Sequence, residues 1–373
     1  MERQIYLDFN ASTPIAPEVL LAMQPYLAGD CFGNPSSVHR FGQLACLGIT
    51  KARQQVAGLL GCESDEVIFT SGGSEANNHA IKGAFFARRE QGNHIITTAI
   101  EHPAVRMPCE YLKRFGAEVT YLPIDGTGRV DPDSLRKAIT KQTILISVMH
   151  ANNEVGTIQP IEEISKIAKE NQILFHSDAA QSVGKIPTHV QTLGVDLLSV
   201  AGHKFYAPKG IGVLYIKRGV AIDPLIHGAG HEQGRRAGTE NTASIVALGA
   251  ASDLFSSGRE MSSVQKFRDL FWALLKDTFG KKVLRNGHPT LVLPNTLNVS
   301  FVGRIGEEIL RKLKGVAAST GSACHSGETK MSPVLEAMGI PFEIGCGAIR
   351  FSLGRTTTEE EIRTVVKQMK EIA

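Results

Sequence analysis

From about residue 16 onward, the sequence alternates short β-rich runs with segments of helical periodicity. Such alternation predicts a mostly parallel sheet covered by helices, with functional residues in the loops at the carboxyl ends of the strands. The β-rich runs are residues 66–70, 93–97, 143–150, 173–177, 196–200 and 211–216. The helical segments between them include residues 39–60, 103–115 and 161–169.

The pattern changes after about residue 257, where a charged helical segment, 261–279, precedes a strand-like run, 296–301. A helical segment, 306–313, and a strand-like run, 348–353, follow. We therefore expect a large domain over residues 15–257. We also expect a small α+β domain that combines residues 1–14 with 258–373. A chain of 373 residues with 42% hydrophobic content can fill both cores.

Composition and charge argue against several classes of partner. The net charge is +3 and no basic run concentrates it, so nucleic acid is not expected. No apolar stretch predicts a membrane span or a signal peptide, so we expect no membrane partner and a cytoplasmic location. The six cysteines lack Cys-x-x-Cys spacing, so we expect neither a disulfide framework nor a zinc ribbon, and most cysteines should be small buried side chains.

Two residues that follow neighbouring β-rich runs indicate pyridoxal phosphate. Lys204 lies in Gly-His-Lys just beyond run 196–200, and Asp178 follows run 173–177. A lysine there can form a Schiff base with an aldehyde cofactor, and an aspartate on a neighbouring strand can keep the pyridine nitrogen protonated. The simpler alternatives are a solvated surface lysine and an aspartate that caps a helix.

Two further turns fall where they could complete such a site. Residues 70–76 predict a strand end, a glycine turn and a helix start, which would direct the N–H groups of Gly72, Gly73 and Ser74 at a phosphate. His102, in Glu-His-Pro, begins a helix after a strand, where its ring could stack on a cofactor and transfer protons. Purely structural roles for these residues are the alternative.

Motifs for other cofactors fail on inspection. The glycine-rich segment from Gly228 has Gln233 at the third glycine position of the dinucleotide fingerprint, which argues against a Rossmann cofactor. His231 has no second histidine at metalloprotease spacing, so no metal is expected. Arg235 and Arg236 are expected to bind a carboxylate or an internal partner.

Cys324 is the best nucleophile candidate. It lies in the polar segment Gly-Ser-Ala-Cys-His-Ser-Gly, unlike the surroundings of a buried structural cysteine. His325 and Lys330 could favour its thiolate, but an ordinary loop with an incidental cysteine is equally consistent with the spacing.

Taken together, these residues resemble the cysteine desulfurases, within the class V aminotransferase group of pyridoxal phosphate enzymes, and the similarity runs almost end to end. It implies the aspartate aminotransferase-like fold (fold type I), with a large mostly parallel-sheet domain and a small α+β domain that carries the cysteine loop. The matching segments are Tyr-Leu-Asp at 6–8, Phe-Gly-Asn-Pro-Ser-Ser at 32–37, Glu-His-Pro at 101–103, His-Ala-Asn-Asn-Glu-Val-Gly at 150–156, His-Ser-Asp-Ala-Ala-Gln-Ser at 176–182, Gly-His-Lys at 202–204, Arg-Arg-Ala-Gly-Thr-Glu-Asn at 235–241, Gly-Ser-Ala-Cys at 321–324 and Arg-Phe-Ser-Leu-Gly-Arg at 350–355.

The resemblance implies a role for each matching residue around the cofactor. Lys204 would bind the cofactor covalently and then remove the α proton of the substrate. The other cofactor contacts would be Asp178 to the pyridinium, Gln181 to the ring oxygen, His102 stacked on the ring, Asn153 beside it, Gly73, Ser74 and His203 at the phosphate, and Thr239 from the neighbouring subunit of a homodimer.

The same resemblance implies the reaction. Arg350 and Asn34 would receive the carboxylate of L-cysteine. Cys324 would take the sulfur as a persulfide, leaving L-alanine, and would pass the sulfur to an acceptor protein, as in iron–sulfur cluster assembly. The sequence ends at Ala373, before the tail by which some desulfurases engage their iron–sulfur scaffold, so the acceptor stays open.

Ala201 keeps a second function open. Many desulfurases have a phosphate-binding serine there, whereas the related selenocysteine lyases tend to have an apolar residue and a similar Ala-Cys-His-Ser loop, here 323–326. Release of selenium from L-selenocysteine is therefore the alternative activity. An aminotransferase would leave Cys324 without a role, and a binding module would not need Lys204 and Asp178.

Overall fold

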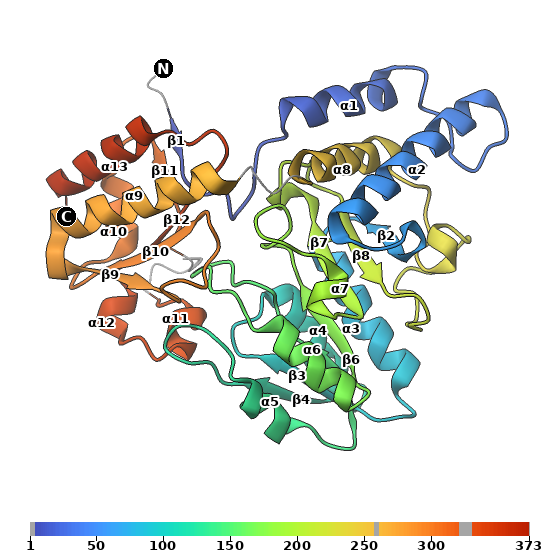
Figure 1. Cartoon of the computed structure of the whole chain (residues 1–373), viewed down its shortest axis with the longest axis horizontal. Coiled ribbons are helices and arrows are strands. Elements are labelled where there is room, and N and C mark those ends of the chain that lie inside the picture. Colours follow the sequence, from blue (N-terminus) through green and yellow to red (C-terminus); the bar gives the residue numbers. More distant parts are fainter. Residues whose placement is uncertain (1–3, 257–260, 321–329, 373) are drawn as a thin grey trace.

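The computed structural model describes residues 4–256, 261–320 and 330–372. Its larger part is built on a seven-stranded sheet of order β2-β8-β7-β6-β5-β3-β4 (Figure 1). Neighbouring strands are parallel except where β8 pairs antiparallel with β2 and β7. The strands are β2 (Val67–Thr70), β3 (His94–Thr98), β4 (Glu118–Leu122), β5 (Thr143–Ser147), β6 (Leu174–Asp178), β7 (Leu197–Ala201) and β8 (Gly212–Ile216).

Successive residues of the central strands enter opposite hydrophobic cores, as the two-residue period of a strand requires. Ile95 and Ile96 show this on β3, and Leu197 and Leu198 show it on β7. Helices therefore cover both faces. The core that contains Ile95 and Leu197 includes residues of α3 (Gly73–Arg88) and α4 (Pro103–Lys113), and the other includes residues of α1 (Pro17–Ala28), α2 (Arg40–Leu60), α5 (Pro132–Ala138), α6 (Ile161–Glu170), α7 (Val190–Leu193) and α8 (Thr242–Phe255).

The smaller part contains a three-stranded antiparallel sheet of order β12-β10-β9. The amino-terminal strand β1 (Ile5–Tyr6) pairs with β11 (Val316–Ala317), so the first and last described elements of the chain both lie on this part (Figure 1). The boundaries predicted at residues 14/15 and 257/258 stay a prediction. The other elements are α9 (Met261–Phe279), β9 (Val283–Asn286), β10 (Thr296–Phe301), α10 (Gly306–Lys312), α11 (Pro333–Ala337), α12 (Phe342–Gly345), β12 (Ala348–Ser352) and α13 (Glu359–Ile372).

The prediction that most cysteines are buried is wrong for the described residues. Of the five that the structure covers, all free thiols, only Cys109 is buried, and Cys46 is exposed. Cys46 follows Ala45 on α2, and Ala45 is the residue that faces the core. Helix phase rather than residue type decides its exposure. Among the described residues, no helix is long and apolar enough to cross a membrane.

A buried ion pair fastens the loop that follows β8 to the larger sheet. Arg53 of α2 donates from both terminal nitrogens to the two carboxylate oxygens of Glu232, at 2.7 and 2.8 Å. The Phe69 N–H of β2 also donates to Glu232, and the guanidinium lies 4.6 Å from the centre of the Phe69 ring. The Arg53 side chain is 17% exposed and the Glu232 side chain 2% exposed, so removing either partner would leave the other charge poorly solvated and unpaired.

Arg53→Met should lower the free energy of unfolding by about 3 kcal/mol, because it leaves the buried Glu232 carboxylate without its cation. Urea titration followed by circular dichroism measures the change. Arg218→Met is the matched control. The pair between Arg218 and Asp65 is exposed and should contribute little to the free energy of unfolding. Equal urea midpoints for the two variants would show that the buried Arg53–Glu232 pair contributes no more to stability than the exposed pair.

Candidate active site

A cavity of about 580 Å³ lies where the carboxyl ends of the parallel strands meet the smaller part of the chain. Its volume is within the range of small-molecule sites. The segments that follow β2, β3, β5, β6 and β7, including the start of α3, supply most of its polar lining, while β6 itself supplies Asp178 and β12 supplies Arg350. Ten predicted site residues line it: Gly72, Gly73, Ser74, His102, Asn153, Asp178, Gln181, His203, Lys204 and Arg350.

Lys204 enters this cavity from a single 3-10 turn, Gly202–Lys204, directly after β7. Its Nζ donates to the backbone oxygens of Asn10, at 2.7 Å, and Ala11, at 3.0 Å. Burial, and next the charge of Arg350, lower the pKa of Lys204 to about 8. The amine is therefore far more often neutral, and nucleophilic, than that of an exposed lysine.

Asp178 is the last residue of β6 and is buried. Its Oδ2 accepts from Asn77 Nδ2 at 2.7 Å and its Oδ1 from the Ala180 N–H at 2.9 Å. This contact lies in a turn and no described helix begins there, so Asp178 is not a helix cap, and its carboxylate forms no ion pair within the described ranges. A buried carboxylate without a cation fits a protonated ring nitrogen.

The start of α3 forms a cradle for an anion. Gly72 has a φ of +147°, which a side chain would oppose, and the helix begins at Gly73. A Cβ on Gly73 would lie 3.1 Å from the Cβ of Ala201, so the cavity wall is already tight here. Backbone N–H groups and the positive end of the helix face this space together with Ser74 and His203.

Glu75 in the first turn of α3 does not oppose an anion, because Arg236 neutralises it. Arg236 donates to the two carboxylate oxygens at 2.9 and 3.3 Å, and the Ser71 N–H donates at 2.9 Å. These contacts keep the pKa of Glu75 below its usual value although burial, the largest effect, acts to raise it. The prediction of an internal carboxylate partner is confirmed for Arg236.

His102 caps α4 with its side chain. Its Nδ1 accepts from the Ala104 N–H at 3.1 Å, so a neutral ring carries its proton on Nε2. Burial is the main cause that lowers the pKa of His102, with Lys204 acting in the same direction and Asp178 against it. The ring is therefore uncharged at neutral pH.

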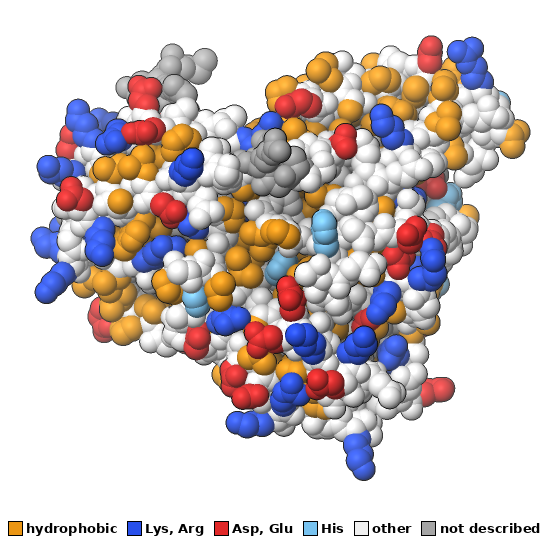
Figure 2. Space-filling view, in the orientation of Figure 1, with side chains coloured by type: hydrophobic (Ala, Val, Ile, Leu, Met, Phe, Trp, Pro, Cys, Tyr) orange, Lys and Arg blue, Asp and Glu red, His pale blue; other side chains and the backbone are white. Residues whose placement is uncertain are grey.

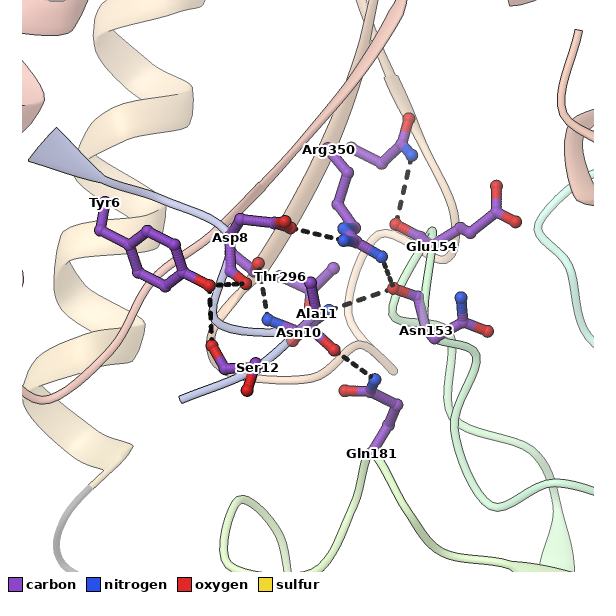
Figure 3. A network of polar contacts seen from close by, with 12 residues as sticks. Tyr6, Asp8, Asn10, Ala11, Ser12, Asn153, Glu154, Gln181, Thr296 and Arg350 are labelled. Carbon is purple, nitrogen blue, oxygen red and sulfur yellow. Dashed lines mark hydrogen bonds and ion pairs between the residues drawn. The ribbon is translucent and has the colours of Figure 1, made fainter. Parts of the chain in front are cut away.

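Arg350 is already paired inside the cavity (Figure 3). It forms an ion pair with Asp8 at 2.5 Å and donates to the backbone oxygen of Asn153 at 3.0 Å. Tyr6 fixes this segment by donating to the backbone oxygens of Asp8 and Ser12. A substrate carboxylate must therefore share the guanidinium with Asp8 or displace it.

Asn10 joins the other polar groups (Figure 3). Its backbone oxygen accepts from Lys204 and from Gln181 Nε2, the latter at 2.9 Å. Its Nδ2 donates to Thr296 Oγ1 at 2.8 Å and to the Asn153 oxygen at 3.2 Å. Sequence reasoning missed these contacts, because an isolated asparagine gives no spacing signal.

Two described residues of the predicted site do not line this cavity. Asn34 is exposed between α1 and α2, where its Oδ1 accepts from the Ser36 N–H. Thr239 is also exposed and does not line the cavity of its own chain. Cys324 lies outside the described residues. Within the described ranges, no cluster of residues could hold a metal ion.

Comparisons with known proteins agree on one family. The profile described as "Aminotransferase class-V" matches residues 5–365. "Cysteine desulfurase IscS" of Dictyoglomus turgidum is 50% identical over 376 residues, which cover 100% of this chain and 95% of that protein. The protein of the same name in Methanosarcina thermophila is 51% identical, with 99% of this chain and 92% of that protein covered.

Two solved structures have closely similar folds over nearly the whole chain. A "NifS-like protein" has a TM-score of 0.92 at 38% identity, with 99% of both chains covered. A structure described as "SspA in complex with cysteine" has a TM-score of 0.85 at 38% identity, with 95% of this chain and 100% of that chain covered.

In protein stripped of any cofactor, Lys204 should react with acetic anhydride with a pH midpoint near 8, against about 10.4 for an ordinary lysine. Competitive labelling read by peptide mass spectrometry measures it. Arg350→Gln should raise the midpoint because it removes a cation, and Asp178→Asn should lower it because it removes an anion. Midpoints unmoved by both variants would show that these charges do not act on the amine.

Proposed function

This chain belongs to the class-V aminotransferase family and is a cysteine desulfurase that uses pyridoxal phosphate, and we propose how its residues convert L-cysteine to L-alanine. The observation that carries the assignment of roles is that Lys204 and Asp178 line the same cavity. A lysine with its pKa lowered to about 8 shares one cavity with a buried carboxylate that no described cation neutralises.

When bound, pyridoxal phosphate supplies an aldehyde for amino groups and a protonated ring that accepts electrons. Lys204 would hold it and, once displaced by the substrate, would remove the α proton. Asp178, held by Asn77, would keep the ring nitrogen protonated. Gln181 would donate to the ring oxygen, and His102 would stack on the ring.

The remaining cofactor contacts would hold its phosphate and one face. The helix start at Gly73 and Ser74 supports phosphate binding, since it presents unpaired N–H groups. His203 is suited to neutral hydrogen bonding, because burial and Lys204 lower its pKa to about 4. Asn153 would lie beside the cofactor and the substrate.

Arg350 would receive the substrate carboxylate, with Asn34 as a second contact. A guanidinium matches a carboxylate through two parallel hydrogen bonds. The Asp8 pair supports this role, because it shows that a carboxylate fits against Arg350 at this position.

Cys324 would complete the reaction. Its thiolate would attack the substrate sulfur, so that an S–S bond forms while the Cβ–S bond breaks and its electron pair stays on carbon. Alanine then leaves after the carbon takes up a proton, and the persulfide passes its outer sulfur to an acceptor protein. We place this exchange in the cytoplasm. This proposal is supported by the five described cysteines, which are all free thiols, as is usual in a reducing compartment.

A homodimer would supply the residues that the single chain leaves outside its cavity. Apolar side chains gather on the surface over α1 and α2 (Figure 2). Leu21 is 65% exposed and Leu47 is 65% exposed, and the loop that holds Asn34 joins their two helices. An apolar face of this kind supports contact with a second copy, whose Thr239 would reach the cofactor phosphate.

Wild-type protein should form alanine and sulfide from L-cysteine. Lys204→Ala and Cys324→Ala should each reduce the rate at least about 1,000-fold, because each removes a reacting group. Lys217→Ala is the matched control, since Lys217 is exposed and pairs with Asp196. Efficient turnover of L-selenocysteine with little turnover of L-cysteine would instead favour the lyase activity, and alanine from neither substrate would exclude both.

Replacing Leu21 and Leu47 together with glutamate should raise the dimer dissociation constant at least about 100-fold, because an apolar interface excludes unpaired charge. Light scattering after size exclusion measures the mass. Cofactor retention should fall in parallel if Thr239 acts across subunits. Leu284→Glu, at an exposed site on β9, is the control. A double variant that stays dimeric would place the interface elsewhere.

A further inference from the structure

Lys185 has no part in the roles above, yet its amine lies beside the cofactor residues. It follows Gln181 by four residues in the turn after β6, where its N–H donates to the Ser182 oxygen. Its Nζ donates to Gln181 Oε1 at 2.7 Å and to Asn10 Oδ1 at 3.0 Å. One amine thus holds the oxygens of two carboxamides.

These contacts decide which end of each carboxamide faces the cavity. The oxygen and nitrogen ends have the same shape, so hydrogen-bond partners alone determine the orientation. Because Lys185 donates to Oε1 of Gln181, the amide nitrogen points the other way and donates to the Asn10 backbone oxygen at 2.9 Å. That oxygen also accepts from Lys204, so the N–H end of Gln181 faces the residue that binds the cofactor.

The arrangement does not require a charged lysine. Burial of the amine lowers the pKa of Lys185 well below its usual value, and the nearby cations Lys204 and Arg350 act in the same direction. A neutral amine still has two N–H groups, one for each of the two amide oxygens that accept from it. Both oxygens therefore keep their donor in either protonation state.

We propose that Lys185 is a positioning residue that fixes the carboxamide of Gln181 with its N–H end toward the cofactor ring oxygen. The inference rests on the role proposed above for Gln181. Without Lys185, the Gln181 oxygen has lost its donor, and the carboxamide can turn its oxygen toward the ring oxygen, where two acceptors repel each other.

The test uses the holoenzyme and the pH midpoint of the visible absorbance of its bound cofactor. Gln181→Leu removes the donor, so the ring oxygen should hold a proton more tightly. The midpoint should then rise by about one pH unit, which is a tenfold change in the proton dissociation constant. Lys185→Met should raise the midpoint in the same direction, and Lys185→Arg, which keeps N–H donors, should restore the wild-type value. Circular dichroism and urea titration of each variant verify folding.

A double-mutant cycle separates positioning from a direct charge effect. In the Gln181→Leu background, Lys185→Met should add no further shift. An equal shift in both backgrounds, or no shift from Lys185→Met in wild type, would overturn the inference while leaving the role of Gln181 intact. A midpoint unchanged by Gln181→Leu would overturn both roles.

Discussion

The active-site cavity depends on the buried hydrogen bonds of Asn10, which lies between the two sheets. Toward the smaller sheet, its N–H donates to Ser352 Oγ at 2.9 Å and its side chain donates to Thr296. Toward the larger sheet, its backbone oxygen accepts from Lys204 and Gln181. Since buried polar groups are costly to leave unpaired, these bonds hold the two walls of the cavity in one arrangement.

Burial also sets the chemistry of the residues along those walls. It is the largest cause of the lowered pKa values of Lys204, His102 and His203, and so it makes the neutral form of each side chain more abundant than in an exposed residue. The Asp178 carboxylate lines the same cavity and acts against this effect on Lys204 and His102. Proton transfer in such a site needs little reorganisation of charge, because the groups are already held and desolvated.

Much of this arrangement could be predicted from the sequence. Apolar runs buried on both faces marked the central strands, and the segments 261–279 and 296–301 coincide with α9 and β10. The edge strand β4 was missed, since Glu118–Leu122 is mostly half-exposed and has no continuous apolar run. Asn77 and Asn10 were missed because their roles arise only from tertiary contacts with Asp178 and Lys204.

The pair between Asp8 and Arg350 means that the guanidinium already has a carboxylate partner before a ligand arrives. A ligand that brings its own carboxylate therefore exchanges one anion for another instead of meeting an uncompensated charge. Long-range attraction contributes little to such an exchange, so substrate capture should be nearly indifferent to ionic strength. Discrimination then depends on how well the rest of the ligand fits the cavity.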